Sequence, residues 1–180
     1  NFYQVFIFIK NTVNQYLIKV GHQFYMEDEL YRGTLIYRGK EYQGIEMKYD
    51  IFDQQLILYI KHNNSLVRIV PLNDFISAFS LGNKFFSKYN FHGEPRFYQV
   101  VYDTEELKCL YYWFKQRNDS NTNSKSITYE FTDSKKKNYL VLNGSVITYR
   151  NKRSFLEIFP VEINARVRKY IEDNHIKVTK

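Results

Sequence analysis

Histidine is the residue type that most often binds metal ions in proteins, and the chain contains four of them. They are His22, His62, His92 and His175. No two of them stand at a metal-binding spacing such as HxH or HxxxH. Each has a Gly or Asn as a direct neighbour, which is typical of residues in turns. We therefore predict neither a metal site nor a cofactor.

Nucleophiles and acids show no catalytic pattern either. Ser120, Ser124 and Ser126 lie in the polar segment 117–126, which lacks the rigid support that a catalytic serine needs. The chain has no GxSxG motif and no glycine-rich phosphate-binding loop. The acidic run at residues 27–29 places its carboxylates next to each other, whereas acid–base catalysis needs them across a cleft. These observations predict a protein that is not an enzyme.

The net charge and the single cysteine exclude fewer functions. The net charge is +7, from 26 basic and 19 acidic side chains that are interleaved along most of the sequence. This interleaving is typical of a solvated surface, so we do not expect a nucleic-acid partner. The one basic run, residues 135–137, is expected in a turn. Cys109 cannot form an intrachain disulfide and is interpreted as a buried structural thiol.

The aromatic segment 110–114 is the first candidate for partner binding. On a strand, Tyr111 and Trp113 face one side, and the alternate residues face the other. An exposed face of this kind could stack bases or sugars, or bind a protein. We favour burial on both sides, because Trp and Phe dominate protein cores. The exposed alternative nevertheless makes Tyr111 and Trp113 candidate partner-binding residues.

The segment 162–174 has the periodicity of a helix, and it carries the second candidate. Its apolar residues fall at i, i+4, i+7 and i+8, and they are Ile163, Val167, Tyr170 and Ile171. Arg166, Arg168 and Lys169 lie near the polar side and could bind phosphates or an acidic partner. A solvated face balanced by neighbouring acids is the alternative that we favour.

Most of the remaining chain has the alternation of β-strands. The expected strands of the first part are 2–9, 30–37, 42–49, 55–60, 66–70 and 75–81. Gly39 should supply the positive φ of a hairpin turn, and Gly44 should mark a bulge or a close backbone approach. The segment 85–97 contains Gly and Pro, so it is expected to be an irregular loop.

The second part continues the pattern. Further strands are expected at 97–102, 107–116, 127–131, 138–142 and 146–150. The segment 117–126 has no apolar residue and is expected to be a mobile loop. Asn143-Gly144 is a hairpin-turn signal. An antiparallel meander of this length predicts a mainly β fold, a sandwich or a partly closed barrel, with a C-terminal α-helix.

The length of 180 residues suits one domain with terminal extensions. We expect an N-terminal strand or extension at 1–20, a β-rich domain at 21–160 and a C-terminal helix at 161–180 that packs on it. The apolar stretch 5–9 is too short to span a membrane, so no membrane span is expected.

One resemblance covers most of residues 21–177. Gly21, Phe24 and Tyr25 match a Gly-x-Pro-Tyr-Leu-like start, with Gln23 where that pattern has Pro, and residues 49–52 match a Tyr-Asn/Asp-hydrophobic-aromatic turn. "FLEIFP" followed by the basic helix "RKYIEDNHIK" matches a common ending. In these features the chain resembles a set of uncharacterised, exported β-rich proteins of Bacteroidota. The resemblance implies a periplasmic or outer-membrane-associated location, and it carries no activity.

These observations lead to one leading hypothesis and two alternatives. The leading hypothesis is a non-enzymatic, extracytoplasmic β-domain that acts as a binding or accessory module in a cell-envelope assembly, with another envelope protein as partner. One alternative is a β-barrel that holds a small apolar ligand or lipid. The other is an enzyme whose residues come together from distant loops around a deep polar cleft.

Overall fold

The computed structural model describes residues 16–63, 65–91, 93–123, 126–149 and 151–178. The strand expected at 2–9, His92 and Ser124 lie outside these residues. The strands of the first half are β1 (Tyr16–Val20), β2 (Tyr31–Tyr37), β3 (Lys40–Asp50), β4 (Gln55–His62), β5 (Ser65–Ile69), β6 (Ile76–Leu81) and β7 (Lys84–Phe91). Those of the second half are β8 (Glu94–Asp103), β9 (Leu107–Phe114), β10 (Arg117–Asn123), β11 (Ser126–Phe131), β12 (Lys135–Leu142) and β13 (Ser145–Ile147). A 3-10 turn (Asn73–Phe75) and the helices α1 (Lys152–Leu156) and α2 (Val161–Asp173) complete the fold.

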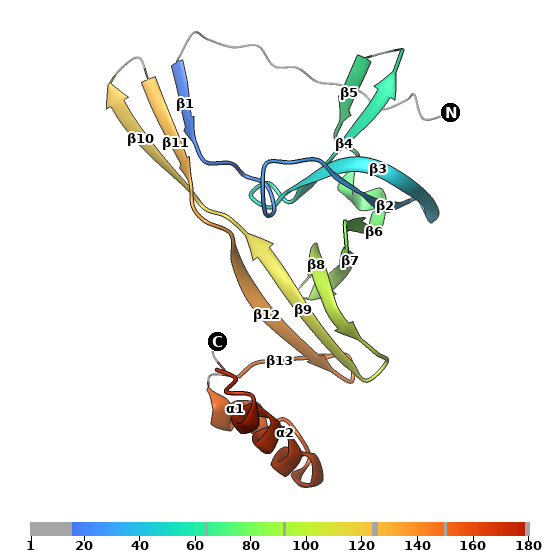
Figure 1. Cartoon of the computed structure of the whole chain (residues 1–180), viewed down its shortest axis with the longest axis vertical. Helices are drawn as coiled ribbons and strands as arrows, with labels where there is room; N and C mark the ends of the chain where they lie inside the picture. The colour runs from blue at the N-terminus through green and yellow to red at the C-terminus, as the bar shows by residue number, and fades with distance from the viewer. Residues whose placement is uncertain (1–15, 64, 92, 124–125, 150, 179–180) are drawn as a thin grey trace. The chain divides into compact units, whose positions relative to one another are not determined.

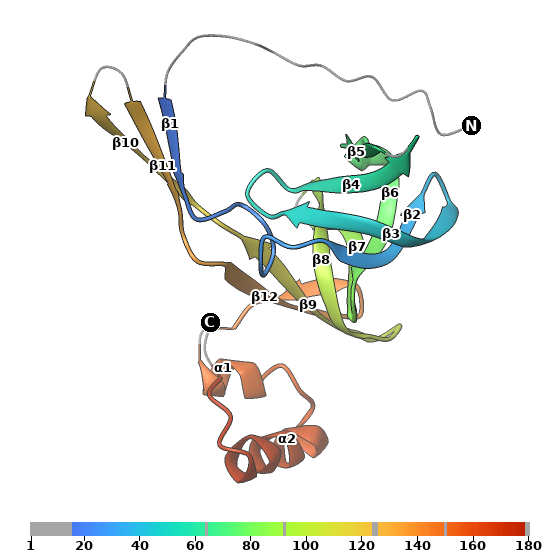
Figure 2. The same ribbon diagram turned by 45° about the horizontal axis from the view of Figure 1, so that its top comes forward.

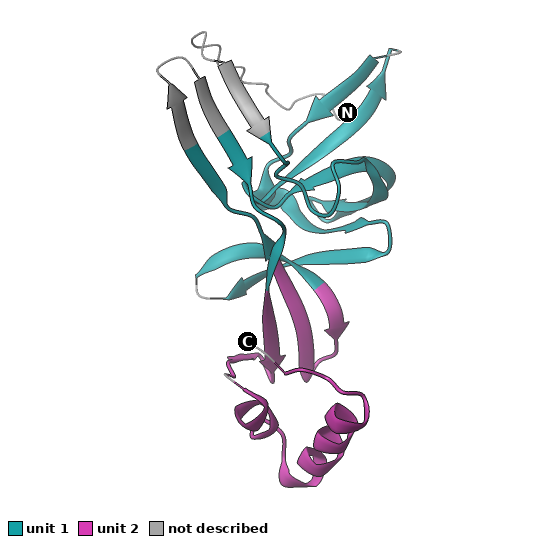
Figure 3. Ribbon diagram, turned by 60° about the vertical axis from the view of Figure 1, so that its left-hand side comes forward, with its two compact units in different colours: residues 1–99, 113–136 teal, residues 100–112, 137–180 magenta. Residues whose placement is uncertain are grey.

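The chain forms two compact units, shown in different colours in Figure 3. Unit 1 consists of residues 1–99 and 113–136, and unit 2 of residues 100–112 and 137–180. Strands β8, β9 and β12 contribute residues to both units. The domain ranges expected from the sequence stay a prediction.

A ten-stranded sheet makes the fold mainly β, as the alternation predicts. Its strand order is β13-β12-β9-β8-β7-β6-β2-β3-β4-β5, so β13 and β5 are its two end strands. Figure 1 labels the strands. The strand pairs of this sheet for which the structure gives a register are all antiparallel. The predicted mainly β fold with a C-terminal helix is therefore confirmed, and the sheet is not closed into a barrel.

The segment 117–126 is not the loop that its polarity predicts, because β10 covers most of it. β10 pairs antiparallel with β11, which also pairs in parallel with β1. Arg117 donates to both carboxylate oxygens of Asp119, at 2.7 and 2.9 Å, and its guanidinium lies 4.2 Å from the Tyr129 ring centroid. Backbone pairing and these contacts hold a strand that has no apolar side chain of its own. The loop prediction was wrong, because composition does not report cross-strand partners.

The β2–β3 hairpin confirms both glycine predictions (Figure 2). Arg38 and Gly39 have φ of 52° and 72°, the backbone of a two-residue hairpin turn. The register shifts between Gly33 and Leu35, where one residue of β2 lies opposite two residues of β3. Gly44 lies in this bulge with φ of 69°.

Two further turn or loop predictions were wrong. The segment 85–97 is mostly strand, because β7 and β8 form a hairpin around Gly93, whose φ is 88°. The aromatic residues in this segment supply enough β propensity to override the Gly and Pro signals. The basic run 135–137 begins β12 instead of lying in a turn, and Lys136 Nζ lies 5.6 Å from the Trp113 ring centroid.

The core of unit 1 is built largely from aromatic rings. Phe79 and Phe86 stack with centroids 4.9 Å apart, and Tyr49 and Phe97 meet Phe79 edge-on at 5.1 and 5.2 Å. All four side chains are buried. Edge-to-face and stacked packing at these distances fills space densely. The interior of unit 1 is therefore occupied by its own side chains.

The two helices lie in unit 2. Asn151 caps α1 through a reciprocal capping box with Ser154. Asn164 on α2 donates to the Leu156 carbonyl at 2.6 Å, and Lys152 forms an ion pair with Glu172 at 2.8 Å. The predicted helix at 162–174 is thus confirmed as α2. Neither helix, within the part of the chain that the structure describes, has the length and apolar character needed to cross a membrane.

Candidate functional site

Trp113, one of the two predicted partner-binding residues of the aromatic segment, contacts the core of unit 1. Its indole Nε1 donates to Gln99 Oε1 at 2.7 Å, and its ring meets Tyr25 edge-on at 5.3 Å. Tyr111 belongs to unit 2 and is half-buried. Within the aromatic segment 110–114, Leu110 is buried and the other four side chains are half-buried. Their role in binding a partner stays a prediction.

The basic residues of α2 remain exposed in unit 2. Arg166, Arg168 and Lys169 are on the surface, and no ion pair between them and an acid is found among the described residues. The predicted apolar face is only partly covered, because Ile171 is buried while Tyr170 is 62% exposed. Partner binding by these three basic side chains also stays a prediction.

Gln99 organises a buried polar cluster in unit 1. Its Oε1 accepts hydrogen bonds from Trp113 Nε1 at 2.7 Å and from the Tyr25 hydroxyl at 3.3 Å. Burial, followed by the charge of Tyr31, raises the pKa of Tyr25 to about 12. Tyr25 therefore stays protonated at neutral pH and acts as a donor. The cluster fixes the packing of β8 and β9 against the segment that precedes β2.

Asp50 closes the turn after β3. Its Oδ1 accepts from the backbone N–H groups of Phe52 at 3.0 Å and Asp53 at 2.9 Å. Burial raises the pKa of this carboxyl, and the two N–H donors oppose that rise. The hydrogen bonds to the local backbone are typical of an Asx turn. Asp50 is therefore a structural acid.

Lys115 is a buried amine of unit 1. Its Nζ donates to the His22 carbonyl at 2.6 Å, and burial lowers its pKa while the nearby charge of Asp133 opposes this change. The lysine, which directly follows β9, ties that end of the strand to the segment before β2. Among the described residues, no three His, Cys, Asp or Glu side chains are grouped closely enough to hold a metal ion.

Strand β5 is the terminal strand of the ten-stranded sheet and belongs to unit 1. Among the strands that the structure describes, it pairs only with β4, so no described strand covers its other side. Leu66 on β5 is 51% exposed, and Leu72 just beyond the strand is 61% exposed. An edge strand directs the N–H and C=O groups of alternate residues away from the sheet, where a further strand can pair with them. The backbone edge of β5 and the exposed side chains of Leu66 and Leu72 together form a surface that can bind a protein.

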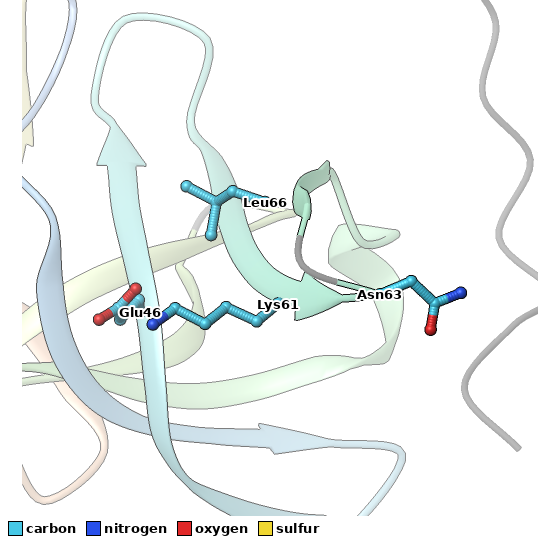
Figure 4. A pocket seen from close by; sticks show the side chains of 4 residues that line it. All are labelled: Glu46, Lys61, Asn63 and Leu66. Carbon is cyan, nitrogen blue, oxygen red and sulfur yellow. The ribbon is translucent and has the colours of Figure 1, made fainter.

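A depression lies beside the hairpin formed by β4 and β5. It has a volume of about 660 Å³ and is lined by Glu46, Lys61, Asn63 and Leu66. In Figure 4, Lys61 extends from β4 toward Glu46 on β3, with Leu66 above, whereas Asn63 points the other way. The lining thus combines a cation, an anion and an exposed apolar side chain, all from β3–β5 and their turn.

The sequence predicts β5 as a strand but does not identify it as an edge. One signal was available, because Pro71 lies two residues beyond the end of the strand, and proline within sheets is confined to edge strands, strand starts and bulges. The order of strands in the sheet depends on pairings such as β2 with β6, which are far apart in the chain. No local pattern reports such pairings.

Comparison of the chain with protein-family models, with curated proteins and with solved structures found no match.

Proposed function

We propose that the chain is a non-enzymatic binding or accessory module of an extracytoplasmic protein assembly in the cell envelope, and that it binds its partner protein through the open edge of β5. The single observation that carries the binding part is this edge, which no described strand covers, with its exposed Leu66 and Leu72. A strand edge that no other strand covers can pair with another chain. Strand addition is a common mode of protein recognition.

The location rests on the sequence. The match of Gly21, Phe24 and Tyr25, of the turn at 49–52 and of the C-terminal segment to exported β-rich proteins supports an envelope location. Fractionation of the producing cells, with an antibody against the chain, tests this part. Recovery of the chain with cytoplasmic markers would contradict it.

The apolar-ligand alternative is not proposed further. It requires an enclosed cavity, whereas the ten-stranded sheet is open and the interior of unit 1 is filled by Tyr49, Phe79, Phe86 and Phe97. No observation among the described residues favours it over protein binding.

Site-specific photo-crosslinking tests the binding surface. A photoreactive amino acid replaces Leu66 in one variant, and Val161 in a control variant, because Val161 is apolar and 85% exposed but lies in unit 2. We expect a discrete crosslinked product with an envelope protein from position 66 and none from position 161. Excess unlabelled protein should suppress the product, and excess Leu66→Asp variant should not. Equal products from both positions, or none from position 66, would contradict the proposal.

A further inference from the structure

The face of the sheet next to the β5 edge carries a row of charged side chains. Cross-strand pairing aligns Arg32, Glu46, Tyr59 and Arg68 across β2, β3, β4 and β5. These residues share one face because residues paired directly across neighbouring strands point to the same side. Arg68 stands at the open end of the row.

The neighbouring row adds a second cation, one strand in from the edge. Lys61 on β4 pairs with Leu66 on β5, and both lie two residues from the first row, so they share its face. Arg32, Lys61 and Arg68 are all exposed, and Glu46 is the only acid in the two rows. Neither Lys61 nor Arg68 forms an ion pair with a described residue. The edge therefore has an excess of positive charge on this face.

The bulge of β3 accommodates the third cation. A Cβ placed on Gly44 would lie 3.0 Å from Arg32 Nη2, which shows that the guanidinium lies directly over this glycine. The positive φ of Gly44 keeps the position free of a side chain. Arg32 is thereby held on the same face as Lys61 and Arg68.

The opposite face of β5 is apolar. Val67 and Ile69 are half-buried, and Ile69 packs against the core of unit 1. A strand that adds to β5 thus meets Val67 and Ile69 on one face, and Leu66 and Arg68 on the other. Favourable neighbours are apolar side chains on the first face and carboxylates on the second.

We propose that the partner segment bound at β5 is an extended strand in which acidic side chains alternate with apolar ones, so that a carboxylate faces Arg68 and its apolar side chains face Val67 and Ile69. This inference rests on the proposed protein-binding function and specifies the partner's chemistry. A second copy of the chain does not provide this complement through β5, because Ser65–Ile69 contains no acidic residue. Two paired β5 strands would leave both arginines without a carboxylate.

Binding of short synthetic peptides to the whole chain tests the proposal. The probe is a peptide in which Val and Glu alternate, and the comparison peptide has Lys in place of Glu. We expect the Val–Glu peptide to bind, with an affinity that falls as salt rises, and the Val–Lys peptide not to bind. Hydrogen exchange measured by mass spectrometry should slow in residues 65–69 and not in α2 when the Val–Glu peptide is present.

Charge-reversal variants distinguish the edge from a general attraction to a basic protein. Arg68→Glu should weaken Val–Glu binding by about tenfold or more, since an attractive cross-strand pair becomes a repulsive one. Lys177→Glu makes the same change in net charge at an exposed position of unit 2, and it should leave binding unchanged. Arg68→Gln provides a milder loss if Arg68→Glu does not fold, as judged by circular dichroism.

Three outcomes would overturn the proposal. Equal weakening by Arg68→Glu and Lys177→Glu would show attraction to net charge alone. Concentration-dependent dimers with slow exchange at residues 65–69 in the absence of peptide would show that a second copy occupies the edge. If the Val–Glu peptide does not bind while crosslinking from position 66 succeeds, the partner chemistry is wrong and the proposed function stands.

Discussion

Gln99 accepts hydrogen bonds from two ring systems at once, since the Trp113 indole lies 2.7 Å and the Tyr25 hydroxyl 3.3 Å from its Oε1. All three residues belong to unit 1. The two donors come from β9 and from the segment before β2, so the amide links parts of the chain that are far apart in sequence. A single buried acceptor thus serves two aromatic donors.

Replacing this acceptor should destabilise the protein. Gln99→Leu removes the partner of two donors at a site where water has little access, which we expect to lower the free energy of unfolding by about 2–3 kcal/mol. Urea unfolding followed by the fluorescence of Trp113, the only tryptophan, measures the change. Gln43→Leu is the control, because Gln43 is exposed and bonds only to exposed Glu41 among the described residues. Equal effects of the two substitutions would contradict the role of the cluster.

Tyr25 should make stability depend on pH in the alkaline range. Its pKa is raised from 10.0 to about 12 in the folded protein, so folding favours the protonated phenol. This contribution is fully present below pH 10 and is lost as the pH rises toward 12. Tyr25→Phe lacks the ionising group, so the stability difference between wild type and variant should shrink over this interval. A constant difference from pH 9 to about 12, measured by urea unfolding, would contradict the raised pKa.

Asp50 should make the stability of the protein depend on pH in the acidic range. Burial raises its pKa above the ordinary value of 3.8, so the folded state holds the proton more tightly than the unfolded chain. The wild type should therefore lose stability relative to Asp50→Asn as the pH rises from below 3.8 through the raised folded pKa. Parallel urea titrations of both proteins between acid and neutral pH provide the measurement. An opposite slope would show that the Phe52 and Asp53 donors outweigh burial.

Substitution by alanine should reduce stability by very different amounts at two glycines. A Cβ on Gly33 would lie 1.8 Å from the Ser80 carbonyl oxygen, which is backbone of the paired strand β6 and cannot move without disturbing the sheet. Gly33→Ala should cost about 3 kcal/mol or more. Gly39 has open space around it and only its positive φ opposes a side chain, so Gly39→Ala should cost about 1 kcal/mol. Thermal unfolding compares the two, and equal losses would contradict the close approach of β2 and β6.

Local patterns predicted many elements of this protein, but not β7 or β10. Alternation placed β3, β4, β6 and β9 close to their observed bounds, and the 3.6-residue period placed α2. Glycine chemistry identified the Arg38-Gly39 turn and the bulge at Gly44, because a positive φ is a property of a single residue. These signals are carried by neighbours in the chain.

Only the tertiary structure decided which elements meet. Polar β10 forms because β11 pairs with it, and Trp113 turns inward because Gln99 lies opposite its indole nitrogen. The position of β5 at the end of the sheet follows from the strand order, in which β6 pairs with β2 across some forty intervening positions. The row from Arg32 to Arg68 follows from the registers of the consecutive hairpins from β2 to β5. Pairings of this kind depend on the total packing of the core, and a local stretch of sequence does not report that energy.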